Sequence, residues 1–385
     1  MATIVETSAT DRRGVDGPWV AVARELGPGF AARAAAHDAD DSFVAENYVE
    51  LKERKVFGAA IPAELGGGGA SYPEICEMIR VLARHCGSTA LALSMHTHLV
   101  ATNVWNWKQG RPVEPLLRRV AAEQIVLVST GASDWLESSG RAEKVDGGYK
   151  VTARKIFGSG SPAGALLITS AVYDDPQQGP TVLHFPVTIA AEGVAVQDNW
   201  RTLGMRGSGS NDIVLDGAFV PDAAVAMTRP PGKWHPFFVV VASVALPIVL
   251  AAYLGVAEAA AELARGIAAK RRNDPNTFYL VGEMENALAT AQMAVRGMVE
   301  IADDYRFEAS NQTASAIVVR KTIAANAVLQ TAEKALEVAG GGAFFRALGL
   351  ERLLRDAHGA QFHPLQEKRQ HLFTGRVALG LDPIG

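Results

Sequence analysis

Hydrophobic positions recur with helical spacing over residues 17–120. The clearest stretch begins at a capping box, Ser71-Tyr-Pro-Glu74, whose serine and glutamate are placed to bind the free amides at the start of a helix. A single apolar stripe follows, formed by Ile75, Met78, Ile79, Leu82 and Ala83. Because these positions share one face of a 3.6-residue helix, they predict an amphipathic helix within an all-α domain, which we place at residues 1–122.

The period of the pattern changes to two at about Gln124. Short apolar runs then follow, separated by turn residues such as Asp146-Gly147-Gly148. The runs read IVLVST, GYKVTARKIF, ALLITSAVY, TVLHFPVTIA, GVAVQD and NDIVLDGAFVP. Closely spaced short strands of this kind are typical of a β-sandwich or barrel, and we place that domain at residues 123–232.

Helical periodicity returns at about Trp234 and continues to the end of the chain. We expect helices over 235–270, 279–308, 312–339 and 344–378. Long helices with short links suit an up-down four-helix bundle, here at residues 233–385. The predicted fold is therefore an α+β multi-domain architecture, with an N-terminal helical domain, a central β-sandwich or barrel and a C-terminal four-helix bundle.

Residues 237–257 are uncharged, and this run is long enough to cross a bilayer. Pro247 lies within it, and its alanines dilute its hydrophobicity. A helix that is apolar on all sides is also what the centre of a bundle requires. We therefore interpret the run as a buried core helix.

Composition narrows the functional classes. The chain has 385 residues, with 48% hydrophobic and 20% charged residues and a net charge of −4, which indicates a folded protein without a basic surface for nucleic acid or an anionic membrane. The two cysteines, Cys76 and Cys86, do not form a disulfide framework or a metal-binding spacing. The first residues lack the apolar core of a signal peptide, so we expect a cytoplasmic protein.

Motifs near the end of the chain occur in a characteristic order. A glycine run, Gly340 to Gly342, precedes Arg355-Asp356 and then Phe362-His363-Pro364. This order resembles the last helices of the acyl-CoA dehydrogenase superfamily, and residues 56–99 resemble its N-terminal helical domain. The resemblance continues through the β region in Ser129-Thr130-Gly131-Ala132-Ser133-Asp134, Lys155-Ile156-Phe157-Gly158-Ser159-Gly160-Ser161, Leu203-Gly204-Met205-Arg206 and Val220-Pro221.

The resemblance implies a flavin cofactor, FAD or FMN. It places Phe157 and Ser159 against the isoalloxazine, where an aromatic ring covers a flavin face and a hydroxyl binds its polar edge. It also places Ser129, Thr130 and Ser133 in a strand-end loop that contacts flavin and substrate.

A second part of the cofactor site is implied at a subunit boundary. By resemblance, Arg271 or Arg272 neutralises the flavin pyrophosphate of a neighbouring subunit. Gly340 and Gly341 fit the flavin-contacting loop, and Glu337 lies where many relatives carry glutamine. The family organisation therefore implies a homodimer or homotetramer.

The sequence departs from the family where a base is needed. Relatives that dehydrogenate acyl thioesters supply a glutamate about eight residues after the Arg-Asp pair, and counting from Asp356 reaches Pro364. Others place the base on the first bundle helix, but residues 237–257 contain no Asp or Glu. General-base catalysis raises a reaction rate by about 10²- to 10⁴-fold, so an acyl-thioester dehydrogenase would not be expected to lack a carboxylate at both positions. Glu367 is the nearest carboxylate, and we expect it to be solvated.

His363 adjoins the vacant position, and a histidine there resembles the monooxygenase branch of the superfamily. Those relatives take reduced flavin from a separate reductase and oxygenate an aromatic ring, a sulfur or a nitrogen. Such chemistry requires a dry pocket and a donor or base, which His363, Ser159 and either His96 or His98 would supply. His96 and His98 are two residues apart, so they point to different helix faces and cannot share a metal.

Three functional hypotheses follow, two for an enzyme that acts on a small molecule and one for a non-catalytic protein. We favour oxygenation by reduced flavin of an aromatic or heteroatom compound. The alternative is dehydrogenation of an acyl thioester with a non-standard base. A third hypothesis is a non-catalytic flavin-binding or scaffold protein.

Overall fold

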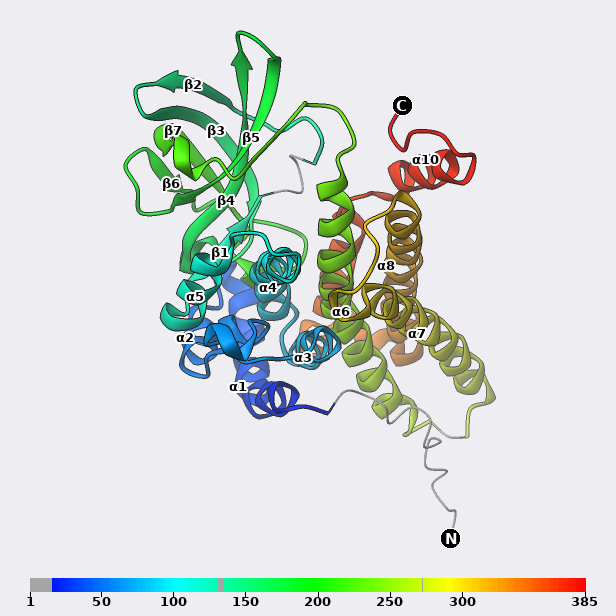
Figure 1. Cartoon of the computed structure of the whole chain (residues 1–385). Coiled ribbons are helices and arrows are strands. Elements are labelled where there is room, and N and C mark those ends of the chain that lie inside the picture. Colours follow the sequence, from blue (N-terminus) through cyan, green and yellow to red (C-terminus); the bar gives the residue numbers. More distant parts are fainter. Residues whose placement is uncertain (1–15, 131–134, 272) are drawn as a thin grey trace.

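The computed structural model describes residues 16–130, 135–271 and 273–385. An N-terminal helical region, a β region and a C-terminal helical region follow one another along the chain, as expected, and Figure 1 shows the β region at the top of the molecule beside the long C-terminal helices. The N-terminal helices are α1 (Pro18–Asp40), α2 (Ala45–Glu53), α3 (Tyr72–His85), α4 (Gly87–Lys108) and α5 (Glu114–Glu123).

The capping box at the start of α3 forms only in part. The Ser71 hydroxyl accepts a hydrogen bond from the Glu74 amide at 3.3 Å, as a serine N-cap should. The Glu74 carboxylate, however, accepts from the Trp19 amide of α1 at 2.9 Å. The glutamate therefore joins two helices instead of closing the cap of its own helix.

The β region forms an eight-stranded sheet with the order β6-β7-β3-β2-β4-β5-β8, and β1 pairs with β4 outside this path. The strands are β1 (Val126–Ser129), β2 (Arg141–Val145), β3 (Gly148–Gly158), β4 (Gly164–Asp175), β5 (Gly179–Thr188), β6 (Val194–Val196), β7 (Asn211–Pro221) and β8 (Met227–Arg229). Its buried side chains, including Val151, Phe185 and Ile213, form a core of their own. The two helical regions instead share one continuous core, with α6 packed against both of them.

The C-terminal helices are α6 (Pro236–Ala268), α7 (Pro275–Ala302), α8 (Asn311–Ala339), α9 (Leu350–His358) and α10 (Glu367–Ala378). Helix α6 is long and apolar enough to cross a membrane, but 89% of its most hydrophobic window is buried inside the protein. The interpretation of residues 237–257 as a core helix agrees with this burial.

The expectation of one continuous helix over 344–378 is wrong. A 3-10 turn, η9 (Gly359–Phe362), ends α9, and the chain is extended at His363 before α10 begins. Proline disfavours helical conformation in the residue before it, so Pro364 breaks the helix at His363. The break lets His363 leave the helical surface and enter a cavity.

Candidate active site

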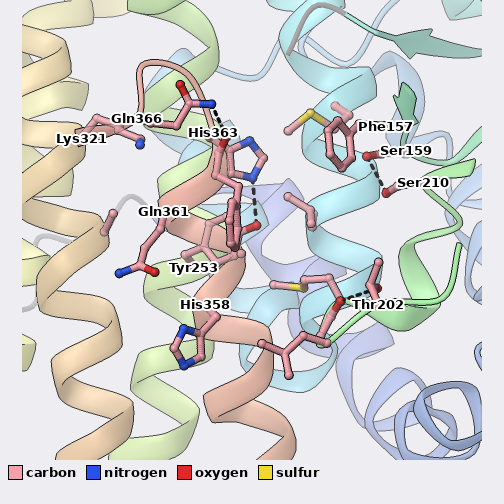
Figure 2. Close-up of a pocket in the computed structure, with 18 of the residues that line it drawn as sticks. Phe157, Ser159, Thr202, Ser210, Tyr253, Lys321, His358, Gln361, His363 and Gln366 are labelled. Atoms are coloured by element: carbon pink, nitrogen blue, oxygen red, sulfur yellow. Dashed lines mark hydrogen bonds between the residues drawn. The ribbon is translucent and has the colours of Figure 1, made fainter. Parts of the chain in front are cut away.

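A cavity of about 1130 Å³ opens between the β region and helices α8 to α10, and we call it the outer cleft. Figure 2 shows Phe157, Ser159 and Ser210 on one side of it and Tyr253, Lys321 and His363 on the other. Its lining includes Ser129, Phe157, Ser159, Trp200, Ser210, Tyr253, Lys321, Arg355, His358, His363, Glu367, Lys368 and Arg369. The cleft therefore combines aromatic rings, hydroxyls and a basic rim.

Phe157 has an unusual backbone. Its φ is +62°, and the pairing of β3 with β7 shifts register between Lys155 and Gly158. Backbone strain of this kind costs about 1–3 kcal/mol for a bulky residue, and a bulge re-aims the side chain of a strand. The ring is 45% exposed and lines the cleft edge-on to Trp200, with centroids 6.0 Å apart. The strand is thus distorted where it presents an aromatic face.

A row of hydroxyls lies beside this aromatic pair. Ser159 Oγ is 2.8 Å from Ser210 Oγ, which is 2.7 Å from Ser208 Oγ. Ser159 and Ser210 line the outer cleft, and both are largely buried. Hydroxyls can donate or accept, so this row can adapt to a ligand edge that carries both kinds of polar atom.

His363 forms a hydrogen bond with Tyr253 of helix α6. Its Nε2 lies 2.8 Å from the hydroxyl of Tyr253, and burial, Lys321 and His98 lower the pKa of His363 to about 3. Burial raises the pKa of Tyr253 well above its usual value, so the phenol stays protonated. We assign the phenol as donor to Nε2, which leaves the proton of a neutral His363 on Nδ1. A Cβ on Gly359 would lie 2.5 Å from this hydroxyl, so the turn after α9 needs glycine for the pair to form.

Lys321 is a buried cation on α8. It is 1% exposed, its Nζ donates to the Leu365 carbonyl at 3.1 Å, and burial lowers its pKa to about 8. The interaction ties α8 to the segment between α9 and α10. It also places a positive charge next to the outer cleft at neutral pH.

A second, smaller cavity of about 160 Å³ lies between α4, the sheet and α6, and we call it the inner chamber. Its lining is Met95, His98, Leu99, Thr102, Ser129, Thr130, Trp135, Ile168, Thr169, Ser170, His184, Phe237, Phe238, Val241, Ala242, Ala245, Leu246, Val249, His363 and Pro364. Met95, Ser129 and His363 line both cavities. These three side chains therefore stand at the boundary between the outer cleft and the inner chamber.

The two candidate histidines of α4 point apart, as expected from their spacing. His96 accepts from the Leu127 amide at Nδ1 (3.0 Å), so its Nε2 donates to the Phe57 carbonyl (2.9 Å). Both ring nitrogens are thereby used by backbone, which favours a structural role. His98 instead lines the inner chamber.

The remaining expected cofactor residues fall into two groups. Ser129 lines both cavities, whereas Thr130 lines only the chamber and bonds Thr169 at 2.9 Å between hydroxyl oxygens. Glu337 is exposed and pairs with Lys334 at 2.8 Å. Ser133 and Arg272 lie outside the described residues.

Arg271 and the glycine run meet in space, away from the outer cleft. Arg271 donates to the Ala339 carbonyl at 3.0 Å, and its guanidinium lies 3.3 Å from where a Cβ on Gly340 would stand. Gly340 has a φ of +70°, while a Cβ on Gly341 would meet no atom within 4 Å. Their role at a neighbouring subunit's flavin stays a prediction.

Sequence reasoning missed several cleft residues, including Tyr253, Lys321, Trp200 and Ser210. Tyr253 reads as one more core position of an apolar helix, and its partner lies 110 residues further along the chain. Lys321 carried a usable signal, because it falls on the stripe of Ile317, Ala324 and Val328, where a lysine interrupts buried positions.

The groups that line the outer cleft fit a flavin. Phe157 and Trp200 offer aromatic surface for a planar ring, and Ser159 with its hydroxyl neighbours can bond the polar edge of that ring. Lys368 and Arg369 on the exposed rim suit a phosphate.

Comparison with known proteins identifies the family. The N-terminal domain profile of acyl-CoA dehydrogenases matches residues 21–112, and their C-terminal domain profile matches residues 248–367. The chain is 28% identical over 352 residues to the amino sugar nitrososynthase RubN8 of Streptomyces rubradiris, covering 87% of this chain and 83% of the relative. It is 25% identical over 396 residues to the dibenzothiophene monooxygenase of Mycolicibacterium goodii, covering 94% of each.

Among solved structures, KijD3 in complex with FMN and dTDP-3-amino-2,3,6-trideoxy-4-keto-3-methyl-D-glucose superposes with a TM-score of 0.86. That pair is 28% identical, and the match covers 97% of each chain. The chain is therefore a flavin-dependent oxidoreductase that belongs to the acyl-CoA dehydrogenase superfamily.

Proposed function

We propose that this enzyme is a monooxygenase that takes reduced flavin from a separate reductase and inserts one atom of O₂ into a small organic substrate. The observation that carries the proposal is that the described lining of the two cavities contains no buried carboxylate. Among the described residues that line the two cavities, Glu367 is the single carboxylate, and it is exposed on the rim. His363, a neutral imidazole, and Pro364 occupy the place of the missing glutamate.

Dehydrogenation of a thioester needs a carboxylate poised at the substrate, because removal of the α-proton in a dry site is costly without one. Asp356 is the buried carboxylate nearest in sequence, but its Oδ1 accepts from the Met205 amide at 2.5 Å and it does not line either cavity. Burial raises its pKa to about 6. Its contacts favour a structural tie between α9 and the β region.

Oxygenation balances without a carboxylate. Reduced flavin and O₂ supply two electrons and two oxygen atoms, of which one enters the substrate and the other leaves as water. The chain's own residues have simpler tasks. Phe157 and Trp200 would cover the flavin ring and Ser159 and Ser129 would bond its polar edge, while His363 holds a proton at Nδ1 and Tyr253 fixes the orientation of that imidazole.

Exclusion of water is the second requirement, and the apolar lining of the inner chamber favours it. Its walls come from Leu99, Phe238, Leu246 and other apolar side chains of α4 and α6. A site of this kind keeps solvent from the reacting atoms, which prevents loss of the oxidant to side reactions.

The relatives support the same choice. A nitrososynthase and a dibenzothiophene monooxygenase are named for oxidation of a nitrogen and a sulfur compound, respectively. The structure of KijD3 with FMN supports FMN as the flavin, with FAD as the alternative. A flavin reductase as partner, a homodimer or homotetramer and a cytoplasmic location remain parts of the proposal.

Dehydrogenation is kept as the second candidate because of one observation. Glu367 does line the outer cleft, where Asn326 donates to its Oε2 at 3.2 Å. A movement of the first turn of α10 would be needed to bring this carboxylate from the rim to a buried substrate. The candidate thus depends on a change of structure that oxygenation does not need.

The experiment supplies FMN, NADH and a flavin reductase to the full chain under ¹⁸O₂, with indole and dibenzothiophene as substrates. We expect one ¹⁸O atom per product molecule, formed only when the chain is present. In parallel, the oxidised flavin complex is titrated anaerobically with butyryl-CoA. Loss of the yellow flavin absorbance in that titration, without ¹⁸O in any product, would replace oxygenation with dehydrogenation.

A further inference from the structure

Resting on the proposed function, we propose that the inner chamber is the substrate site, and that it takes a neutral molecule of one or two aromatic rings carrying a single N–H or O–H donor. Indole and phenol have this chemistry. Nucleotide-linked sugars and acyl thioesters do not.

The size of the chamber sets the first limit. Its volume is about 160 Å³, close to the roughly 150 Å³ of a dry apolar cavity that binds benzene in another protein. A nucleotide-linked sugar or a coenzyme A thioester has several times the volume of benzene. Only a compact ring system fits within this volume.

The shape of the walls favours a flat molecule. Phe238, Ala242, Ala245 and Val249 follow one another at helical spacing, so one face of α6 forms a side of the chamber. The Trp135 ring stacks on Phe238 with centroids 4.9 Å apart and an interplanar angle of 26°. Aromatic surfaces beside alanine methyls leave room for a ring and add stacking contacts.

The charge of the lining sets the second limit. Within the described parts of the chain, the chamber wall contains no Asp, Glu, Lys or Arg side chain. Its three imidazoles are neutral at pH 7, because burial is the main factor that lowers the pKa of His98 to about 4 and those of His184 and His363 to about 3. An ion would lose its hydration without gaining a partner, so the chamber selects uncharged molecules.

Four of the chamber's hydroxyls, all except that of the boundary residue Ser129, are already satisfied by protein groups. Thr130 and Thr169 bond each other, Thr102 donates to the His98 carbonyl, and Ser170 pairs with Ser138. Because these hydroxyls already have hydrogen-bond partners, they do not require polar groups on a ligand, and a largely apolar molecule can bind beside them.

One ring nitrogen remains as an acceptor. His98 Nδ1 lies 3.3 Å from the Ser94 carbonyl and must donate to it, so Nε2 carries the lone pair. The side chain is 7% exposed and lines the chamber. A ligand N–H or O–H that reaches this nitrogen gains a hydrogen bond worth about 0.5–1.5 kcal/mol, so it is favoured over an equivalent ring that lacks one. His184 offers no second acceptor, because its Nε2 accepts from Arg229 Nε at 3.0 Å.

The position of the chamber connects it to the reaction. Met95, Ser129 and His363 line both cavities, so a molecule in the chamber contacts the same side chains as a molecule in the outer cleft. The outer cleft alone, at about 1130 Å³, has room for the flavin. Cofactor and substrate therefore meet at the His363 boundary.

The test measures binding without oxygen or reductant. Indole, and benzothiophene as a matched ring without the N–H, are titrated into the full chain by calorimetry in the presence of FMN. We expect indole to bind at least fivefold more tightly than benzothiophene. His98→Leu should abolish this preference, because it should weaken the binding of indole but not that of benzothiophene.

Filling the chamber is the second arm. Ala245→Phe places a ring in the chamber, and Ala242→Leu is a milder variant in case the larger one does not fold. Ala259→Phe makes the same change on the same helix outside both cavities and serves as control. We expect at least tenfold weaker indole binding for Ala245→Phe, with FMN affinity within twofold of the parent and the control unchanged.

Either of two results would overturn the inference. One is unchanged indole affinity in both folded filling variants. The other is tighter binding of butyryl-CoA or of a nucleotide-linked sugar than of indole. If indole binds as expected but no ¹⁸O product forms, the proposed oxygenation fails while the chamber assignment stands.

Discussion

The outer cleft and the inner chamber share the side chains of Met95, Ser129 and His363 but differ in size and in the charge of their lining. The cleft is large, exposed at its rim and surrounded by charges such as Lys321, Arg355 and Glu367. The chamber is small, and its described lining is uncharged. The difference separates two tasks, because a phosphate-bearing cofactor needs charged and polar partners, whereas an oxidisable apolar substrate needs a dry site. Variants that act on only one of the cavities can test this division.

The largest effect should follow from removing His363, one of the three side chains that line both cavities. His363→Ala should lower the rate of ¹⁸O incorporation by about 10²-fold or more, the scale of acid–base groups in active sites. His371→Ala, an exposed histidine on α10, is the matched control. A His363→Ala rate within threefold of the parent would make His363 structural and the shared wall unimportant.

Asp356, a buried carboxylate outside both cavities, should affect how the free energy of unfolding depends on pH. Burial raises the pKa of Asp356 to about 6, so the folded protein favours the protonated form. Stability from this group is present below its unfolded pKa near 4 and is lost as pH rises through 6. Two pKa units correspond to about 3 kcal/mol.

Asp356→Asn keeps an acceptor for the Met205 amide and removes the charge. The free energy of unfolding of the variant minus that of the parent should therefore increase by about 3 kcal/mol between pH 4 and pH 7. Urea unfolding at several pH values measures this difference, with exposed Asp216→Asn as control. A difference that does not change with pH would show that Asp356 is well solvated or well paired.

Tyr253 should affect the orientation of His363 without contributing to binding. Tyr253→Phe removes the hydroxyl 2.8 Å from Nε2 and should lower kcat about tenfold with KM unchanged, the value of one hydrogen bond. The buried hydroxyl of Tyr305, which has no hydrogen-bond partner within the described chain, gives a matched control in Tyr305→Phe. An equal loss of kcat in Tyr253→Phe and Tyr305→Phe would indicate general damage to the helical core.

The fold was predictable because its signals are local. A stripe of apolar residues after Ser71 predicts α3, and alternation after Gln124 predicts the strands. The continuous 344–378 helix was wrong because 3-10 turns precede α9 and because Pro364 ends the helical segment that follows. The local sequence pattern therefore predicted where helices and strands lie more reliably than where a helix is broken.

The candidate site was predictable only in part, and the reason is tertiary. Phe157, Ser159, Ser129 and His363 came from a resemblance in motif order, and all four line the outer cleft. The Tyr253 hydroxyl matters because a turn 106 positions later lacks a Cβ at Gly359, a relation that no local pattern contains. Interactions of this kind can be found only once distant segments are placed together.

Lys321 should tune cofactor affinity with pH. Burial lowers its pKa to about 8, so its positive charge is present at pH 7 and lost as pH rises through 8. FMN affinity should fall about fivefold between pH 7 and pH 9, or roughly 1 kcal/mol. Quenching of FMN fluorescence measures it. Lys321→Arg should remove the pH dependence of FMN affinity, and Lys321→Met should bind FMN weakly at both pH 7 and pH 9. The affinity for indole should be the same in both variants as in the parent.

Glu367 should have the smallest effect, and that result would be informative because dehydrogenation depends on this carboxylate. The side chain is exposed, and its hydrogen bond is to Asn326 at 3.2 Å, not to a group at the His363 boundary. Glu367→Gln keeps the shape and the acceptor, so the ¹⁸O incorporation rate should stay within threefold of the parent. A loss of 10²-fold or more, together with bleaching of the parent's flavin by butyryl-CoA, would assign Glu367 as a base. In that case the rim of the outer cleft would have to close over a substrate, and the division between a charged cofactor cleft and an uncharged reaction chamber would not hold.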